Sequence, residues 1–204
     1  GHDVGGFTGP ELEAELFVRW VQNGIFQPRF CIHSDASRAL ASEPWMYPEV
    51  LPLIREAIAF RYRLIPYLYT LFVEAAQTGH PIVRPLVYAF PEDPNCYTES
   101  FDFMLGPNLL VASVLAPGQR KRKVTLPQGT WWCDFHTGAW YAGGQTVAVD
   151  APLSRIPLFA PEGANHEGPA YSVYGTQWIL HYLETLRSFS GESLYDAPCL
   201  RNYA

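Results

Sequence analysis

The spacing of apolar residues changes near residue 80, and this change limits what the chain can fold into more than any other feature. From about Pro48 to Thr78, apolar side chains recur at the spacing of an α-helix. Over residues 81–164, short β-prone runs alternate with turn signals such as PGQ, PQG, HTG and AGG. The pattern predicts a helix-containing α/β domain over residues 1–80, followed by an antiparallel β-sandwich of about seven or eight strands.

A shorter helix is predicted ahead of the long one. Pro10 fits its first helical position, with Gly9 or Thr8 as the cap. Leu12 begins an apolar face at helical spacing, and Gly24 is expected to end the helix. The helix therefore directly follows the glycine-rich start of the chain.

A strand and a loop are predicted between the two helices. The run PRFCIH, residues 28–33, has strand character, and residues 34–47 have the composition of a loop. Residues 1–47 therefore form the order loop, helix, strand, loop, which is half of an α/β repeat. Pro66 lies inside the long helix, where proline removes a backbone donor, so we expect a kink near Tyr62.

Composition narrows the class of protein. Hydrophobic residues make up 48% of the 204 residues and charged residues 17%, which is typical of a folded domain. Aromatic residues make up 15%, which suits carbohydrate binding but suits a bulky core equally well, and the core is the default. The net charge is −6, and the RKRK run at residues 120–123 is expected to be a solvated strand face, so we expect no nucleic-acid partner.

The sequence carries no pattern typical of a cofactor or metal site. Its four cysteines, Cys31, Cys96, Cys133 and Cys199, are widely and irregularly spaced, which argues against a zinc site and a disulfide scaffold. It contains no P-loop and no dinucleotide-binding glycine pattern. No run of about 18 apolar residues occurs. We therefore expect no cofactor, no metal and no membrane partner, whereas the cellular compartment is not indicated.

The stretch HDVGGF places an acid directly before two glycines. An acid at the end of a barrel strand is a common way to present a carboxylate at an active site. Gly5 and Gly6 would let the backbone turn sharply next to Asp3 and approach a ligand closely. The equally acceptable alternative is that Asp3 caps a turn before the first helix.

A series of motifs decides between these alternatives. GHDVGGFTG is followed by RWVQNGIFQPRFCIH, then EPW, then RYRLIPYLYTLF. In this order they resemble the end of the catalytic barrel of glycoside hydrolase family 31, which includes α-glucosidases and α-xylosidases. HPIVRPLVYAFPEDPNCY and FMLGPNLLVASVL are similar to the first β-sandwich after that barrel. The resemblance covers about residues 1–164 and implies the last βα elements of an incomplete (β/α)8 TIM barrel, followed by the sandwich.

The resemblance also implies roles for individual residues. Asp3 matches an acid at the end of barrel strand seven, at the sugar subsite where cleavage occurs. Phe7 matches an aromatic residue lining that subsite, and His33 matches a strand-eight histidine that hydrogen-bonds sugar hydroxyls. Trp45 is expected to shape the loop nearby. Arg19, by contrast, is expected to be structural.

The same resemblance predicts that the chain lacks the catalytic pair. Retaining glycosidases need a nucleophile and an acid/base whose carboxyl groups lie about 5 Å apart. In this family both are aspartates, one in a Trp-x-Asp-Met-Asn-Glu type block on strand four and one at the end of strand six, and neither occurs here. We expect a fragment of a retaining enzyme that acts on α-linked oligosaccharides or glycosides. Alone it should be inactive, and it should need the N-terminal barrel portion.

A non-catalytic role is the competing hypothesis. A β-sandwich could bind polysaccharide through a platform of exposed rings, formed by Trp131, Trp132, Trp140 and Tyr141. Packing of these rings across a hairpin is the interpretation that we prefer, because cross-strand aromatic pairs stabilise sheets. A third possibility is that the sandwich only buttresses the barrel.

The C-terminal residues 165–204 match nothing that we associate with the family. Apolar residues recur at helical spacing over residues 176–189, which predicts a helix there. The segment is either an altered C-terminus or a helical extension specific to a lineage, and the sequence leaves both possibilities open.

Overall fold

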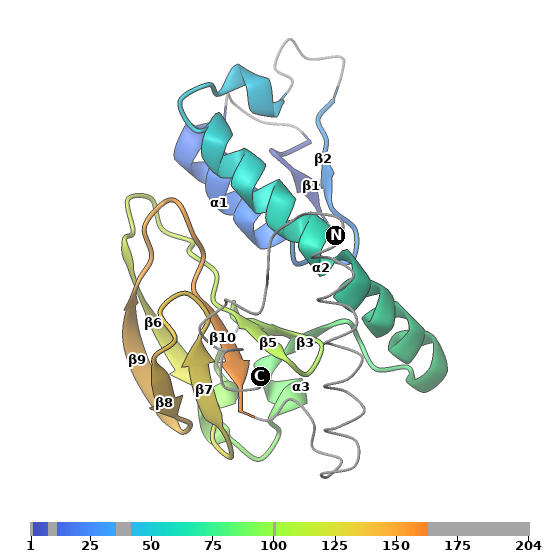
Figure 1. Ribbon diagram of the computed structural model, residues 1–204, viewed down its shortest axis with the longest axis vertical. Coiled ribbons are helices and arrows are strands. Elements are labelled where there is room, and N and C mark those ends of the chain that lie inside the picture. Colours follow the sequence, from blue (N-terminus) through green and yellow to red (C-terminus); the bar gives the residue numbers. More distant parts are fainter. Residues whose placement is uncertain (1, 8–11, 36–41, 100, 163–204) are drawn as a thin grey trace.

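A short β–α–β unit and a long helix form the first part of the molecule (Figure 1). The computed structural model describes residues 2–7, 12–35, 42–99 and 101–162. Strands β1 (Asp3–Val4) and β2 (Cys31–Ile32) flank helix α1 (Ala14–Gly24), and the 3-10 helix η1 (Pro44–Met46) leads into helix α2 (Leu51–Thr78). The predicted order of elements is therefore present, and its two short strands pair in parallel, as expected for the closing βα elements of a barrel.

Helix α1 begins later than the sequence predicts. Glu13 has extended backbone angles, and Ala14 is the first residue of α1; Pro10, the predicted first position, lies outside the described residues. Leu12 therefore precedes the helix, yet it still packs against the main core cluster. Its apolar character reflects burial of an extended segment, which helical spacing alone cannot distinguish from a helix face. The predicted end at Gly24 is confirmed.

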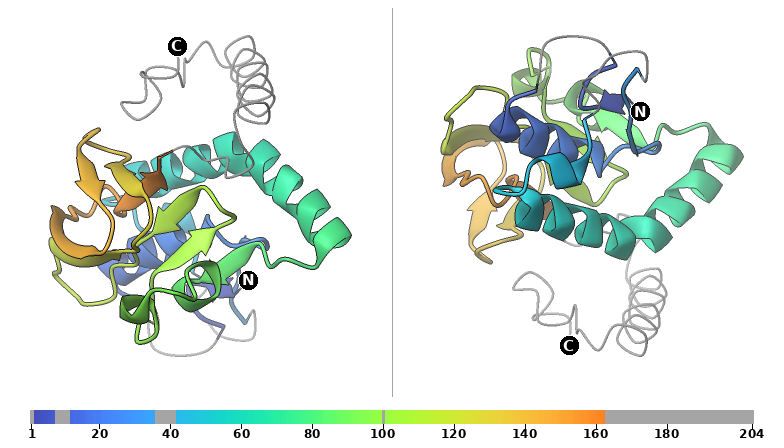
Figure 2. Two further views of the ribbon diagram at one scale, coloured as in Figure 1. Left: turned by 90° about the horizontal axis from the view of Figure 1, so that it is seen from below. Right: turned by 90° about the horizontal axis from the view of Figure 1, so that it is seen from above.

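Helix α2 is long and bent. It has Pro52 in its first turn and Pro66 in its interior, and Figure 2 shows that its axis changes direction about midway along its length. A proline inside a helix removes one hydrogen bond of the helical ladder, which accounts for the bend. Neither α2 nor any other described helix combines the length and the apolar content that crossing a membrane requires.

The second part is an antiparallel β-sandwich with eight strands among the described residues. Its elements are β3 (Val83–Pro85), α3 (Leu86–Ala89), η2 (Pro94–Cys96), β4 (Phe103–Leu105), β5 (Leu109–Val111), β6 (Lys121–Leu126), β7 (Trp131–Asp134), β8 (Trp140–Ala142), β9 (Gln145–Asp150) and β10 (Leu158–Pro161). Six strands form one sheet in the order β3-β4-β5-β10-β7-β8, and β6 pairs with β9 in the other. The predicted sandwich is thus confirmed.

The run PIVRPLVYAF, residues 81–90, is one of the β-prone runs of the predicted sandwich, yet most of it is not a strand. Only Val83–Pro85 forms a strand, and the chain then turns into the short helix α3. Pro85 ends the ladder because it has no backbone N–H to donate, and the apolar Leu86 that follows is buried from the helix. Residues 165–204, including the helix predicted over residues 176–189, lie outside the described residues.

The space between the two sheets is filled by apolar side chains. Trp132 is fully buried there, in a cluster that includes Leu110, Val124, Val147 and Phe159. Trp132 therefore cannot contribute to an exposed aromatic platform, although Trp131 and Trp140 on the same hairpin remain partly exposed. For Trp132, the structure therefore supports packing in the core, which is the role that we prefer from the sequence.

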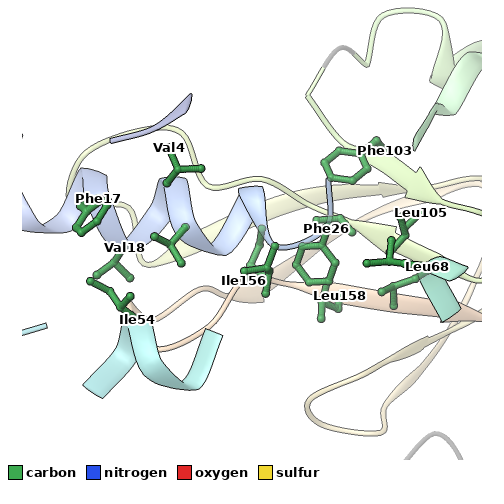
Figure 3. Packing of buried hydrophobic residues seen from close by; sticks show 14 of the residues in the cluster. Val4, Phe17, Val18, Phe26, Ile54, Leu68, Phe103, Leu105, Ile156 and Leu158 are labelled. Carbon is green, nitrogen blue, oxygen red and sulfur yellow. The ribbon is translucent and has the colours of Figure 1, made fainter. Parts of the chain in front are cut away.

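A second core cluster joins the two parts of the molecule. Val4, Phe17 and Ile54 come from the β–α–β unit and α2, whereas Phe103 and Leu158 come from the sandwich (Figure 3). Burial of this shared apolar surface holds the sandwich against the barrel elements. Strands β1 and β2 therefore pack on the same core cluster as the sandwich.

Arg19 adds a polar connection between the same two parts. Its guanidinium is buried and donates to the backbone carbonyls of Gln119, Ala151, Pro152 and Arg155 in the sandwich. These contacts agree with the structural role predicted for Arg19.

Candidate functional site

Two parallel strands bring predicted site residues to one edge of the structure. Strands β1 and β2 pair with Asp3 opposite Cys31 and Val4 opposite Ile32. The backbone N–H of His33 donates to Val4 O at 3.2 Å and so continues this pairing. Because the carboxyl ends of parallel barrel strands meet at one rim, Asp3 and His33 follow adjacent strands at the same rim.

Side-chain alternation separates a core face of these strands from a polar face. Val4 is fully buried, and Ile32 packs against the same core cluster. Successive strand residues point to opposite faces, so Asp3 and Cys31 lie on the face away from that core. Cys31 is partly exposed and carries a free thiol. Sequence reasoning did not select Cys31, although its two-residue spacing from His33 places it on the same face.

Arg29 is a further charged residue at this edge. Its Nη1 lies 3.2 Å from Asp3 Oδ1, with 57% of the Arg29 side chain and 33% of the Asp3 side chain exposed. An ion pair this exposed contributes little to stability. The pair instead fixes the direction of the carboxylate while leaving the second oxygen to accept other hydrogen bonds. No motif in the sequence singles out Arg29.

An exposed aromatic ring covers the histidine. The Phe7 ring centroid lies 5.4 Å from that of His33, with the planes tilted by 37°. Half of Phe7 is exposed, and its carbonyl accepts a hydrogen bond from the backbone N–H of Asp35 at 3.1 Å. The contact holds an apolar ring face next to a group that can both donate and accept a hydrogen bond.

Two glycines build the turn that carries Phe7 to this position. Gly5 and Gly6 have φ angles of 97° and 82°, a region that L-residues with a side chain rarely adopt. The Gly6 N–H closes the turn on Asp3 O at 3.1 Å. A Cβ on Gly5 would lie 2.7 Å from Ser42 Cβ, and Ser42 itself is buried. The sequence prediction that these glycines allow a sharp turn beside Asp3 agrees with this geometry.

Gly5→Ala should therefore lower the free energy of unfolding by about 2–4 kcal/mol, because it combines a disfavoured backbone angle with a steric clash. Urea unfolding followed by circular dichroism measures this change. Gly118→Ala is the matched control, since Gly118 has a φ of 69° but nothing within 4 Å of an added Cβ. Equal losses in the two variants would contradict a tightly packed turn at Gly5.

Trp45 lies on a different element from the other predicted site residues. It belongs to η1 and is 69% exposed. None of the hydrogen bonds or ring contacts between described residues joins it to Asp3, Phe7 or His33. A role for Trp45 in shaping the site stays a prediction.

Arg61 of helix α2 positions the loop that leads into β2. Its guanidinium donates to the carbonyls of Ile25 at 2.6 Å, Gln27 at 2.7 Å and Pro28 at 3.1 Å. It also lies over the Phe30 ring, 5.4 Å from the centroid. Burial lowers the pKa of Arg61 from its usual value, yet an arginine stays protonated. The helical pattern around Arg61 gave no signal of this role, which depends on a loop far away in sequence.

The edge offers groups for binding a polyhydroxylated ligand. A carboxylate accepts hydrogen bonds from hydroxyls, an imidazole donates and accepts, and an exposed ring packs on an apolar face. Asp3 is the carboxylate that the two described parallel strands present there. The described residues contain no cluster of three His, Cys, Asp or Glu side chains that could hold a metal ion.

Comparison with known proteins identifies relatives of both parts. Residues 1–71 match the glycosyl hydrolases family 31 TIM-barrel domain, and residues 79–164 match the glycosyl hydrolase family 31 C-terminal domain. A relative from Arabidopsis thaliana, "Probable glucan 1,3-alpha-glucosidase", is 44% identical over 166 residues, which are 80% of this chain and 18% of that protein. The chain spans about a fifth of the length of the curated relatives that it matches.

Solved structures agree in fold. A GH31 α-xylosidase from a soil metagenome, complexed with xylose, is 37% identical with a TM-score of 0.72, over 78% of this chain and 27% of that one. A cycloalternan-degrading enzyme from Trueperella pyogenes, in complex with cycloalternan, is 32% identical with a TM-score of 0.75, over 81% of this chain and 24% of that one. The chain therefore belongs to glycoside hydrolase family 31, of which it contains barrel elements followed by the C-terminal β-sandwich.

Proposed function

We propose that the edge formed by β1 and β2 is one wall of the sugar subsite of an α-glycosidase. The observation that carries the proposal is the parallel register of the two strands, which brings Asp3 and His33 to the same rim. The Phe7 ring against His33 supports it. Barrel enzymes bind their substrates at this end of the strands.

In this proposal each side chain has a defined task. The Asp3 carboxylate accepts hydrogen bonds from sugar hydroxyls, with Arg29 holding its other oxygen. His33 donates one hydrogen bond and accepts one, and Phe7 packs on the apolar face of the sugar ring. Together they fix the position of the ring, which lowers the reaction barrier by orientation.

The substrate class that we propose is an α-linked oligosaccharide or glycoside. The proposal draws on the relatives, which carry the names α-glucosidase and α-xylosidase, and on a solved relative that holds cycloalternan. We keep the choice of sugar and linkage open, because the edge described here forms only part of a subsite.

We further propose that the nucleophile and the acid/base come from barrel strands outside these 204 residues. A retaining mechanism needs two carboxyl groups, whereas β1 and β2 together present Asp3 alone. A polypeptide of these 204 residues should then bind sugar weakly and hydrolyse nothing. The family-level activity is hydrolysis of α-glycosidic bonds.

An apolar stripe on helix α2 favours contact with further barrel elements. Tyr62, Ile65, Tyr69 and Phe72 recur at helical spacing, and each is at least 47% exposed. Contiguous exposed apolar surface of this kind marks an interaction site. We propose that the N-terminal barrel portion covers this stripe.

We also propose that the barrel part of the chain ends near residue 80.

Hydrolysis of a chromogenic aryl α-glucoside tests the proposal. The 204-residue chain is assayed alone and preceded by the remaining barrel strands. We expect activity only in the longer polypeptide. There, His33→Ala and Asp3→Asn should each lower kcat/KM by about 10- to 100-fold, or about 1.5–3 kcal/mol, since the first removes a donated and an accepted hydrogen bond and the second replaces a charged acceptor by a neutral one.

A variant outside the proposed site provides the control. His80→Ala removes an exposed histidine that hydrogen-bonds Tyr88 far along the chain from β2, so kcat/KM should not change. Hydrolysis by the 204-residue chain alone would contradict the proposed origin of the catalytic pair. Unchanged kcat/KM in both site variants would contradict the proposed subsite.

A further inference from the structure

A polar cavity opens in the β-sandwich, away from β1 and β2. Its volume is about 190 Å³. The polar side chains in its wall come from the β7–β8 hairpin, from β9 and from the segment before β10, namely Asp134, His136, Thr137, Tyr141, Asp150 and Arg155. The strands that carry them are the yellow and orange ones at one side of Figure 1.

The hairpin turn holds the wall of the cavity in place. Asp134 Oδ1 accepts from the backbone N–H groups of His136 at 2.8 Å and Thr137 at 3.1 Å. His136 Nε2 lies 2.7 Å from Ile156 O. A carbonyl can only accept, so Nε2 carries the proton of this bond and Nδ1 of the neutral ring is an acceptor. Asp134 and His136 are therefore fixed parts of the cavity wall.

Burial sets the charge of the histidine. It lowers the pKa of His136 below the usual value, and the nearby Arg155 contributes in the same direction. Arg155 also lines the cavity, and its Nε is buried with no hydrogen-bond partner. The wall thus combines a neutral imidazole, a guanidinium with unused donor capacity and the exposed carboxylate of Asp150.

These groups select the chemistry of a ligand. Asp134 and Asp150 repel an anion, while Arg155 repels a cation, so a neutral ligand fits best. Hydroxyl groups satisfy donors and acceptors together. The Tyr141 ring, which packs edge-on against Phe159 at 6.2 Å, adds a flat surface to the wall. The volume is below the roughly 300–1,000 Å³ typical of pockets for drug-sized ligands, which limits the occupant to one small ring.

We propose that this cavity binds a single neutral sugar residue, so that the sandwich holds a carbohydrate independently of the edge formed by β1 and β2. The hypothesis of a carbohydrate-binding sandwich then rests on the polar cavity. The aromatic platform considered from the sequence contributes only Tyr141. The partner chemistry is a neutral pyranose, free or at the end of a longer glycan.

Nuclear magnetic resonance tests the proposal on the full 204-residue chain. Methyl α-glucoside is titrated as the probe, and backbone amide shifts are followed at residues 134–141 and 148–157. We expect saturable shifts there, with a dissociation constant in the millimolar range. Arg155→Met, which keeps the length of the side chain but removes the guanidinium, should weaken this binding by at least about fivefold, as expected for one lost charge-assisted hydrogen bond.

Matched variants separate the cavity from the rest of the surface. Arg120→Met makes the same replacement at an exposed arginine that pairs with Glu15 outside the cavity, so binding should not change. Asp150→Asn provides a second test at an exposed position, where misfolding is not expected, and should also weaken binding. If no shifts saturate at the cavity, or if neither Arg155→Met nor Asp150→Asn weakens them, the proposal is wrong. Shifts at residues 3–33 report the proposed subsite separately.

Discussion

Replacement of Arg19 by methionine is expected to lower the free energy of unfolding by about 3–5 kcal/mol, the largest loss that we predict for a single side chain. The guanidinium donates to the carbonyls of Ala151 at 2.7 Å, Arg155 at 3.0 Å, Pro152 at 3.2 Å and Gln119 at 3.2 Å. Without it the carbonyls of Ala151 and Arg155 lose their donor, whereas the carbonyls of Pro152 and Gln119 still accept from the Arg155 N–H and from Arg120 Nη1. Methionine keeps most of the apolar stem, so the loss comes from the donors.

The burial of Arg19 explains why the effect should be large. Burial lowers the pKa of Arg19 from its usual value, but the group stays charged because its ordinary value is so high. A buried charge is tolerated here since carbonyl dipoles surround it and Gln22 Oε1 accepts at 3.0 Å. The arrangement fixes helix α1, and with it the β1–α1–β2 unit, against the sandwich.

Urea unfolding of the full chain measures the loss. Arg29→Met is the matched control, because Arg29 makes a 57%-exposed ion pair with Asp3, and exposed pairs of this kind contribute about 1 kcal/mol at most. Arg19→Lys should fall between the two, since one ammonium cannot reach four carbonyls at once. A loss below about 1 kcal/mol in Arg19→Met would contradict the bridging role.

Local patterns predict the elements that carry Asp3 and His33, namely a glycine turn after Asp3 and a strand over residues 28–33. Their placement after adjacent barrel strands came from the family resemblance, and the structure pairs the two strands in parallel. Arg29 and Arg61 could not be selected, because their partners lie 26 and at least 33 residues away in sequence and no periodic pattern encodes such pairs. The sandwich was predictable from alternating runs and turns.

The departures in the fold have a common physical origin. Leu86 is fully buried and Leu12 is partly buried against the main core cluster, and an apolar residue can be buried from an extended segment or from a short helix. Their backbone conformation is decided by neighbours, the extended Glu13 in one case and Pro85 in the other. Apolar periodicity therefore identified part of the core correctly, but it misplaced the ends of these elements, and Ile65 and Phe72 are exposed although they recur at helical spacing.

Asp102 should make the stability of the protein fall as pH rises from about 4 to 7. Burial raises the pKa of Asp102 to about 7, against the opposing effect of Arg122, whose Nη2 lies 2.7 Å from Asp102 Oδ1. Asp102 Oδ2 is buried without a partner, so the ionised form is only half satisfied. In this window the folded chain keeps a proton that the unfolded chain has released, which makes unfolding more favourable at higher pH.

The variant Asp102→Asn isolates this contribution because an amide does not titrate and still offers an oxygen to Arg122. Relative to the wild type, its free energy of unfolding should rise between pH 5 and about 7 by about 1.4 kcal/mol per pH unit at most, and level off above that. Denaturant titrations at a series of pH values measure the difference. A difference that is constant with pH would show that Arg122 keeps Asp102 ionised throughout.

Asp93 is the matched control, since it is as buried as Asp102 but its pKa is shifted in the opposite direction. Burial acts to raise the pKa of Asp93, yet the backbone N–H groups of Gln128 and Asn95 outweigh it and lower the pKa below the usual value. The contribution of the Asp93 carboxylate to stability is complete at any pH above its pKa in the unfolded chain. It is lost only as the pH falls through its lower pKa in the folded chain. Asp93→Asn should therefore cost the same stability at every pH from 5 to 8, whereas the effect of Asp102→Asn changes across that range. The contrast separates a buried carboxylate with a full set of donors from one with an unpaired oxygen.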